Sequence, residues 1–453
     1  MDRSHEDVTR AYPFEEISPW VQVPPDLQAP PDRDVRADVV IIGGGYTGLS
    51  AALSLRAAGI DAAVVEQDFA GSGASGRNAG HLTPTIGKDL PTVLRLFGRQ
   101  RAEALVRYAD AAVEYAEDVI ERRTIDCDYI ASGNVLAGVH AKQEERLRKS
   151  AATAANLGAH VRFLAPDQMR ERGLPPAFLF GVLEERGGTL HPGRYVMGLR
   201  KAALAAGVRL YERAHVTAIE EGTPVKVRCG STTITADHAV VATNAYTPLL
   251  GFRPRALAPL RVTLFETEPL SETLLAKLGW RGREGIYTAH EILESYRLTV
   301  KGTIVGGSKI VRYAWGSALP PGFDPHAFDV VERGFRDRFP ELESVKVARF
   351  WGGWIGLTLD FLPLFGTAGA HRNVHYGIGY AGHGVAQATL MGAMLAERVQ
   401  GRAHPCEHAL ARKERAWPPE PLRWLGAKLL NGALSAVDAR TDRQIRALNR
   451  RAS

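Results

Sequence analysis

Residues 38–66 of this 453-residue chain, DVVIIGGGYTGLSAALSLRAAGIDAAVVE, constrain its fold more than any other stretch. The segment has the pattern of a buried strand, a glycine turn, a helix of small residues and a second strand. Gly43, Gly45 and Gly48 have the G-x-G-x-x-G spacing, which permits a tight turn, close approach of a pyrophosphate and close packing of helix on strand. Glu66 ends the second strand, where a carboxylate accepts hydrogen bonds from ribose hydroxyls and repels the 2′-phosphate of NADP. The segment predicts a Rossmann unit for FAD or NAD, and a glycine turn without a ligand is the alternative.

The loop that follows the second strand, GSGASGRNAGH, favours one of these two nucleotides. It offers backbone N–H groups and the side chains of Ser72, Ser75, Arg77 and Asn78. Such a loop suits a cofactor that continues past its pyrophosphate toward a flavin ring. A surface loop without a ligand is the alternative. We therefore expect FAD.

Composition excludes several other classes of protein. The net charge of +6 comes from scattered basic residues, so we expect no nucleic-acid partner. Cys127, Cys229 and Cys406 form no metal-binding or redox pair, which argues against a disulfide framework and against a metal site. The first residues lack the pattern of a signal peptide, and no run of about 18 apolar residues occurs. We expect a cytoplasmic protein without an integral membrane segment.

Alternation of helical and strand-like patterns predicts an α/β fold, α+β overall, with two domains. The first is a discontinuous FAD-binding Rossmann domain, and the second is a substrate domain built on a mainly antiparallel sheet. The expected division is an N-terminal arm at 1–36, the FAD-binding domain at 37–95, 186–256 and 346–405, the substrate domain at 96–185 and 257–345, and a helical tail at 406–453.

The tail carries an apolar row at helical spacing, formed by Leu422, Leu425, Leu429, Ala433 and Val437. We expect this face to pack on the body of the protein. Weak peripheral contact with a membrane surface is the alternative.

The nucleotide fingerprint, the loop after it and two C-terminal stretches, DFLPLFG and GYAGHGVAQATLMG, are shared with a known family. With them the chain resembles the D-amino-acid-oxidase-like family of FAD-dependent oxidoreductases, and it looks closest to the gamma-glutamylputrescine oxidoreductase branch. The resemblance covers about residues 36–405. It implies a glutathione-reductase-type FAD domain, a substrate domain whose sheet roofs the flavin, and oxidation of a C–H bond next to an amine.

The fingerprint and the resemblance together imply the residues that hold the cofactor. The helix that begins near Gly382 would direct its N-terminus at the flavin pyrimidine ring and stabilise negative charge there. Sarcosine oxidases of this superfamily tether FAD through a cysteine, but Gly353 or Trp354 stands near that place here, so we expect non-covalent FAD. The expected cofactor residues are Gly43, Gly45, Tyr46, Thr47, Gly48, Glu66, Gln67, Ser75, Gly76, Arg77, Asn78, Ala79, Gly80, His81, Val216, Ala242, Thr243, Asn244, Trp351, Gly353, Asp360, Gly382, His383, Gly384 and Val385.

Removal of a hydride from an amine needs a positioned carbon and a dry pocket but no nucleophile, so the catalytic candidates set shape and charge. Tyr287 and Trp354 could wall the amine through their π faces, and a place in the core is the alternative for each. Arg297 could bind a substrate carboxylate or form an ordinary ion pair. His383 could polarise the flavin, and the alternative is that its ring nitrogens only form hydrogen bonds with the backbone. Lys309 roughly matches the lysine with which sarcosine oxidases assist dioxygen, and a solvated Lys309 would instead favour a quinone as acceptor.

Three functions follow from these residues. The first is FAD-dependent oxidation of an amine or amino acid, with imine hydrolysis and peroxide formation from dioxygen; a gamma-glutamylated polyamine, sarcosine, glycine or an aminophosphonate would serve as substrate. The second is a dehydrogenase that passes electrons to a quinone or another carrier. The third is a non-catalytic nucleotide-binding protein. A single fingerprint disfavours enzymes that bind two nucleotides.

Overall fold

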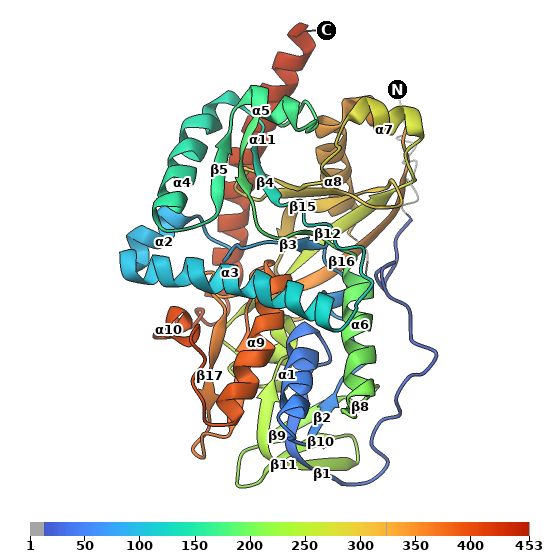
Figure 1. Cartoon of the computed structure of the whole chain (residues 1–453), viewed down its shortest axis with the longest axis vertical. Coiled ribbons are helices and arrows are strands. Elements are labelled where there is room, and N and C mark those ends of the chain that lie inside the picture. Colours follow the sequence, from blue (N-terminus) through green and yellow to red (C-terminus); the bar gives the residue numbers. More distant parts are fainter. Residues whose placement is uncertain (1–12, 323, 453) are drawn as a thin grey trace, which may run out of the picture.

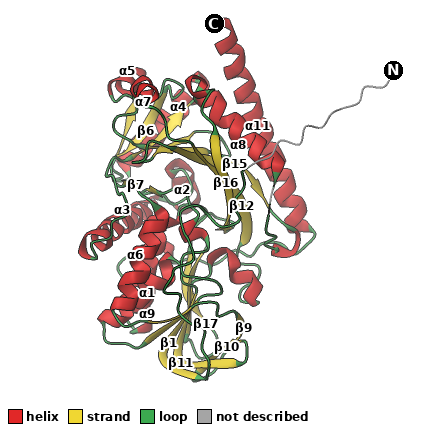
Figure 2. Ribbon diagram, turned by 90° about the vertical axis from the view of Figure 1, so that its right-hand side faces the viewer, coloured by secondary structure: helices red, strands yellow, loops and turns green. Residues whose placement is uncertain are grey.

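The computed structural model describes residues 13–322 and 324–452, so the first twelve residues of the predicted arm lie outside the described residues. The chain folds around two eight-stranded sheets and a two-stranded ladder. Figure 1 shows one sheet in the lower half of the molecule and the other in the upper half, with the long helix α3 (Arg99–Arg122) between them. Figure 2 shows the same two halves from the side.

The first sheet is built around β1 (Val35–Ile42), which pairs in parallel with β2 and β11. Residues 39–42 are all buried, as expected of a parallel strand that is covered on both faces. The order is β17–β18–β11–β1–β2–β8, with β10 attached to β11 and β9 to β10. The other bounds are β2 (Ala62–Val65), β8 (Arg209–Tyr211), β9 (Val216–Glu220), β10 (Val225–Cys229), β11 (Thr232–Val241), β17 (Leu364–Ala368) and β18 (Val374–Ile378).

Helices α1 (Tyr46–Ala57), α6 (Pro192–Ala205) and α9 (Gly384–Val399) cover one face of this sheet. Helices α1 and α9 approach closely because Gly392 has no side chain; a Cβ there would lie 2.5 Å from the carbonyl oxygen of Thr47. Helix α3 packs on α9 and joins the same hydrophobic core. The first sheet and these helices form what we call the nucleotide half.

The second sheet runs β16–β12–β15–β14–β13–β4–β6–β5 and is antiparallel except between β13 and β4. Its aromatic core includes Phe335, on α8 (Pro325–Arg338), whose ring packs against those of Phe265 and Phe339. We call this the second half. Its strands are β4 (Asn134–Gly138), β5 (Val161–Leu164), β6 (Phe180–Glu184), β12 (Ala258–Thr267), β13 (Gly285–Thr288), β14 (Glu294–Leu298), β15 (Ile304–Arg312) and β16 (Val347–Leu357).

The remaining elements border these halves. They are α2 (Leu90–Phe97), α4 (Glu144–Asn156), α5 (Pro166–Glu171), α7 (Glu272–Leu278), α8 (Pro325–Arg338), α10 (Glu407–Leu410), α11 (Leu422–Ala452) and the ladder of β3 (His81–Leu82) with β7 (Gly188–Thr189). Among the residues just described, no helix has both the length and the apolar character that crossing a membrane requires.

The predicted fold class is confirmed, but two predicted domain boundaries differ from the structure. Strand β16 lies in the stretch assigned to the FAD-binding domain, yet it pairs with β12 along its whole length and ends the second sheet. Helix α3 lies in the stretch assigned to the substrate domain, yet its buried alanines pack in the nucleotide half. The local sequence pattern predicts both elements. It does not predict that β16 pairs with β12 or that α3 packs on α9, because these contacts join residues far apart in the sequence.

The predicted packing of the tail is wrong. Helix α11 leaves Leu422, Leu425 and Leu429 exposed and instead turns Asp438 and Ile445 into the body. Hydrophobic periodicity pointed to the apolar row, but buried ion pairs and backbone hydrogen bonds hold the opposite face, as described below.

Candidate active site

One cavity of about 760 Å³ joins the two halves. It runs from the glycine turn after β1 and the acid at the end of β2, along the loop of residues 71–81, to strands of the second sheet and to α11. Its size lies in the range of cofactor and ligand sites. Predicted cofactor residues on its wall are Gly43, Gly45, Tyr46, Thr47, Glu66, Gln67, Ser75, Arg77, Asn78, Ala79, Gly80, His81, Val216, Ala242, Thr243, Asn244, Gly353, Gly382, His383, Gly384 and Val385.

The glycine turn is shaped by the absence of side chains. Gly43 has a φ of +107°, and a Cβ there would lie 2.8 Å from the carbonyl oxygen of Ala242. At Gly45 a Cβ would lie 2.8 Å from the Ser75 hydroxyl, which also accepts the backbone N–H of Tyr46 at 3.0 Å. Helix α1 begins at Tyr46 and lines the cavity with its N-terminal end. This backbone surface suits a pyrophosphate.

Glu66 stands at the end of β2 on the cavity wall. Its carboxylate accepts the backbone N–H of Gly44 at 2.8 Å and that of Asp68 at 3.2 Å. Burial raises the pKa of Glu66 to about 7, against the lowering effect of these hydrogen bonds. Two ribose hydroxyls would supply further donors to the carboxylate. The acid and the side-chain-free turn therefore fit the adenosine end of FAD.

The loop of residues 71–81 is held by its own polar side chains. Arg77 donates to the carbonyl oxygens of Ser72 at 2.6 Å and Gly352 at 3.2 Å. The Asn78 amide donates to the carbonyl oxygen of Ser75 at 2.8 Å and accepts the N–H of Gly80 at 2.9 Å. These side chains fix the loop, so the loop backbone is what faces the cavity for a cofactor.

His81 lies on the cavity wall with its tautomer fixed by Asn134. The Asn134 amide nitrogen donates to the carbonyl oxygens of Leu82 at 2.9 Å and Gly188 at 3.3 Å, so its oxygen faces His81. The His81 Nδ1–H must therefore donate to that oxygen, 3.1 Å away. The buried Nε2 has no protein partner among the described residues, and burial lowers the pKa of His81 to about 4. At neutral pH His81 is a fixed acceptor on the cavity wall.

The N-terminus of α9 closes the cavity near this point. His383 is half-buried, directs Nδ1 to the carbonyl oxygen of Ala381 at 3.1 Å, and has a pKa lowered by burial. Gly384 and Val385 start the helix beside it. Free N–H groups at this helix end face the cavity and favour negative charge on a bound ligand.

Three predicted catalytic residues lie on the wall and two do not. His383, described above, is one of the three, and Tyr287 and Trp354 line the part of the cavity that borders the second sheet. Arg297 is buried away from it, where Nε donates to the carbonyl oxygen of Ala79 and the guanidinium lies 5.2 Å from the Trp20 ring centre. Lys309 is also absent from the wall, because Ser308 and Lys309 both have positive φ in an irregular part of β15. This distortion directs Ser308 to the cavity and Lys309 to the opposite side.

Four predicted cofactor residues also lie off the wall, each for a structural reason. A Cβ at Gly48 would lie 1.9 Å from the carbonyl oxygen of Gly43, and one at Gly76 would lie 2.3 Å from that of Gly71, so both glycines serve packing. Trp351 is fully buried and donates Nε1–H to the carbonyl oxygen of Arg77 at 2.9 Å. Asp360 is paired with Arg412 at 2.8 Å.

Several wall residues were missed. Strand β12 contributes Ala258, Leu260, Val262 and Leu264, whose alternation along the strand was a usable signal. Helix α11 contributes Gly426, Ala427, Lys428, Leu430, Asn431 and Leu434, for which no local signal exists. Cys127, Cys229 and Cys406 are absent from the wall.

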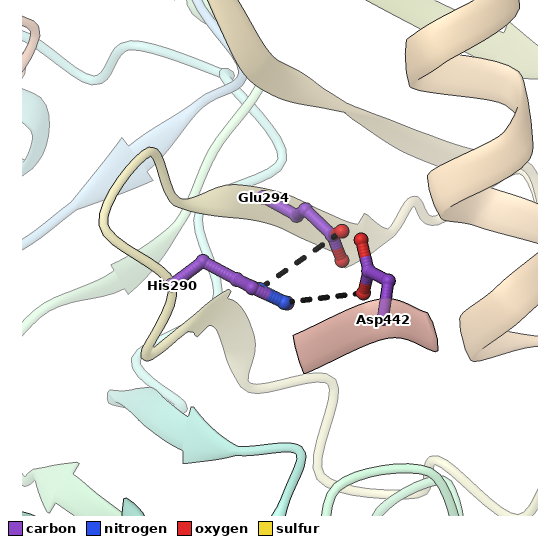
Figure 3. A group of neighbouring side chains, drawn as sticks. All are labelled: His290, Glu294 and Asp442. Carbon is purple, nitrogen blue, oxygen red and sulfur yellow. Dashed lines mark ion pairs between the residues drawn. The ribbon is translucent and has the colours of Figure 1, made fainter. Parts of the chain in front are cut away.

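A separate buried cluster joins α11 to the second half. Figure 3 shows His290, Glu294 and Asp442 converging, with His290 Nε2 3.3 Å from Asp442 Oδ1. Lys309 Nζ lies 2.8 Å from Asp442, and Arg338 Nε lies 3.0 Å from Glu294. Burial alone would raise the pKa of Glu294, but Arg338 and Lys309 lower it to about 2. Because these two cations already neutralise both carboxylates, we expect ion pairs here rather than a metal ion.

Comparison with known proteins gives consistent results. The family model described as DAO, FAD dependent oxidoreductase, matches residues 38–398. The gamma-glutamylputrescine oxidoreductase of Escherichia coli K12 is 32% identical over 379 residues, which is 82% of this chain and 85% of that protein. A probable oxidoreductase OrdL of Rhizobium meliloti is 30% identical, covering 84% of this chain and 87% of that protein.

Solved structures resemble the fold. Glycine oxidase from Geobacillus kaustophilus superimposes with a TM-score of 0.70 at 19% identity, covering 84% of this chain and all of that chain. L-proline dehydrogenase from P. horikoshii has a TM-score of 0.68 at 20% identity, covering 82% of this chain and 95% of that chain. At these identities the likeness shows the fold alone.

Proposed function

The chain belongs to the DAO family of FAD-dependent oxidoreductases, and from that premise we propose that it oxidises an amine or amino acid at the carbon next to nitrogen. The observation that carries this proposal is that one cavity connects the nucleotide turn to the second sheet. We call the part of this cavity that borders the second sheet, with Leu264, Tyr287 and Trp354 on its wall, the chamber. When bound, FAD supplies the acceptor for the hydride. The substrate loses this hydride and a proton to become an imine, which water hydrolyses to a carbonyl compound and either ammonia, from a primary amine, or an amine, from a secondary one.

The chain's own residues orient the substrate and exclude water. Tyr287, Trp354 and Leu264 give the chamber apolar and aromatic walls, which favour a neutral amine over a solvated ammonium ion. His81 lines this chamber, and its Nε2, which has no partner among the described residues, can hold an N–H of the substrate in place. Because the pKa of His81 is lowered to about 4, it stays neutral and does not repel an amine.

Charges on the wall support a substrate that carries a carboxylate away from the reacting amine. Arg312 lines the cavity and is paired with Asp324 at 3.1 Å. Lys428 also lines it, lies 4.0 Å from the Trp424 ring centre, and forms no ion pair with any described residue. The uncompensated ammonium of Lys428 favours an anionic group. We therefore infer a gamma-glutamylputrescine-like substrate, with a carboxylate at one end and an amine at the other.

Dioxygen as final acceptor would make the enzyme an oxidase that releases hydrogen peroxide. A second candidate is a dehydrogenase, which one observation favours. Leu249 and Leu430 both line the cavity and are 56% exposed, so apolar side chains border its opening. Such a border suits a lipid-soluble quinone.

An anaerobic titration tests the proposal. The as-purified protein is titrated separately with gamma-glutamylputrescine, putrescine, glycine, sarcosine and proline while the flavin absorbance at about 450 nm is followed. Bleaching by one compound, with peroxide when air returns, supports the oxidase. Bleaching that air reverses slowly and a soluble quinone reverses quickly supports the dehydrogenase. A protein that binds FAD but is bleached by no amine contradicts the proposal.

A further inference from the structure

Helix α11 carries a continuous apolar surface that no described part of the chain covers. Its side chains are exposed to high fractions, 73% for Leu429, 60% for Leu422 and 45% for Leu425. We call this surface the α11 outer face. It consists of Leu422, Leu425, Leu429, Leu430, Ala433 and Val437. Monomeric proteins rarely leave so regular an apolar row exposed on a single helix.

The opposite side of α11 already anchors the helix. Asp438 accepts the backbone N–H groups of Glu291 and Ile292, both at 2.9 Å, and Ile445 joins the core of the second half. Asp442 enters the buried cluster with Lys309. The outer face is therefore not needed to hold α11 in place, and the helix cannot turn it inward without breaking these contacts.

The charges on the helix select the class of partner. Arg440 and Arg443 continue the line of the outer face beyond Val437, are exposed, and form no ion pair with any described residue. The only acidic residues of the helix, Asp438 and Asp442, are buried on the other side. An apolar stretch followed by unpaired arginines, with no carboxylate between them, complements a bilayer with anionic headgroups.

A second copy of the chain fits this surface less well. Parallel pairing of two outer faces would bring the arginine pairs together, and antiparallel pairing would lay arginines on leucines.

We propose that the α11 outer face docks the protein on a membrane surface rich in anionic lipid. Leu430 belongs both to this face and to the cavity wall. Docking therefore sets the cavity opening beside the bilayer, within reach of lipid-soluble molecules. This proposal concerns binding and does not depend on which amine is oxidised.

Flotation of the full-length, FAD-loaded protein with vesicles tests the docking. Vesicles of phosphatidylcholine containing about 30% phosphatidylglycerol should carry the protein upward, and vesicles of phosphatidylcholine alone should carry at least tenfold less. Raising the salt to about 0.5 M should weaken binding, because headgroup attraction is screened. Absence of binding to the anionic vesicles overturns the proposal.

Paired variants locate the surface. Leu425→Ser with Leu429→Ser should reduce vesicle binding at least tenfold, whereas Leu96→Ser, at a leucine of α2 that is 55% exposed, should leave it unchanged. Arg440→Glu with Arg443→Glu should also reduce vesicle binding at least tenfold. The control, Arg95→Glu with Arg107→Glu, makes an equal change of charge on α2 and α3 and should have little effect on binding.

Two outcomes would assign the surface otherwise. Equal losses of vesicle binding in the two arginine-to-glutamate variants would mean that net charge rather than α11 mediates binding. A concentration-dependent dimer in light scattering, lost in the double serine variant, would assign the face to a second copy. Retained yellow colour in each variant shows that the FAD-binding fold is intact, so a binding result stands whether or not the substrate proposal holds.

Discussion

The nucleotide turn and the chamber beneath the second sheet form one cavity but are built from different materials. The turn is made mainly of backbone, at Gly43 and Gly45, beside the Glu66 carboxylate, and all three residues lie within residues 43–66. The chamber is made of side chains that come from strands and helices far apart in the chain, such as Tyr287 and Lys428. A site made of backbone tolerates no added atoms, whereas a site made of side chains is sensitive to which group stands at each place. Variants on the two sides should therefore fail in different ways.

The largest effect should come from adding atoms to the turn. In Gly45→Val the side chain would meet the Ser75 hydroxyl, since even a Cβ lies 2.8 Å from it, and would fill the space for the pyrophosphate. We expect FAD affinity to fall more than about 1000-fold, leaving a colourless protein. Gly432→Ala, at an exposed α11 glycine with no atom near its Cβ position, is the control and should stay yellow. A yellow Gly45→Val protein would contradict a turn defined by backbone.

Removing one charge from the buried cluster should destabilise the second half. Asp442→Asn leaves Lys309 and Arg338 with a single carboxylate, Glu294, and we expect a loss of about 3 kcal/mol in the free energy of unfolding. Chemical denaturation measures it, and limited proteolysis should show earlier cleavage in α11. FAD affinity should change little, because the cluster lies outside the cavity.

The cluster also predicts an acid limit. Its cations lower the pKa of Glu294 from 4.5 to about 2 despite burial, so its stabilising effect is complete above pH 4.5 and is lost as the pH falls toward 2. Asp442→Asn should lack part of this acid-dependent change. An identical pH profile in both proteins would exclude the cluster as its source.

Substitution of one chamber side chain should affect chemistry without affecting the cofactor. His81→Phe removes the acceptor Nε2, and we expect the rate of flavin reduction by the amine to fall about 100-fold. Stopped-flow absorbance measures the rate, and FAD content should be unchanged. Loss of FAD together with the rate would instead assign His81 to cofactor binding.

A side-chain change in the nucleotide half should have a smaller effect than the glycine variant. Glu66→Gln should weaken FAD binding about 10-fold, which corresponds to about 1.4 kcal/mol. Burial raises the pKa of Glu66 from 4.5 to about 7, so the FAD-free protein loses stability as the pH rises across this range. FAD binds the ionised carboxylate, so its affinity should increase as the pH rises through about 7. Titration of FAD into the FAD-free proteins should show this dependence in the wild type and a flat profile in the variant.

The smallest effect is expected at the border of the cavity. Lys428→Met should raise KM about threefold for a substrate with a carboxylate and leave kcat unchanged, because an exposed charge contributes little. The same amine without its carboxylate should show no change. An equal change for both substrates would remove Lys428 from substrate recognition.

The contrast between the halves also explains what sequence could predict. The nucleotide turn and Glu66 are encoded by neighbouring residues, so spacing and type located them. His81 was placed on the wall by its loop, but its tautomer depends on Asn134, whose partner carbonyls lie 52 and 54 residues away. Lys309 was misplaced because an irregularity of β15 reverses the side on which it lies. Alternation along a regular strand carries no warning of such a reversal.

The tail shows the same limit in a stronger form. Its apolar row suggested which face would be buried, yet Asp438 and Asp442 on the other face find partners on β15 and α8 and in the turn before β14. Those partners come together only in the folded second half. No periodicity within residues 422–452 could reveal them.

The placement of α11 bears on how the enzyme acquires its cofactor. The match to the family model ends at residue 398, whereas the wall formed by Gly426 to Leu434 comes later in the chain. During synthesis every backbone element of the nucleotide turn emerges from the ribosome before this wall does. Until α11 folds onto the body, the cavity lacks this wall, so we expect bound FAD to dissociate more slowly once α11 is in place. The order of synthesis therefore places the nucleotide turn, in residues 43–66, well before the wall formed by residues 426–434.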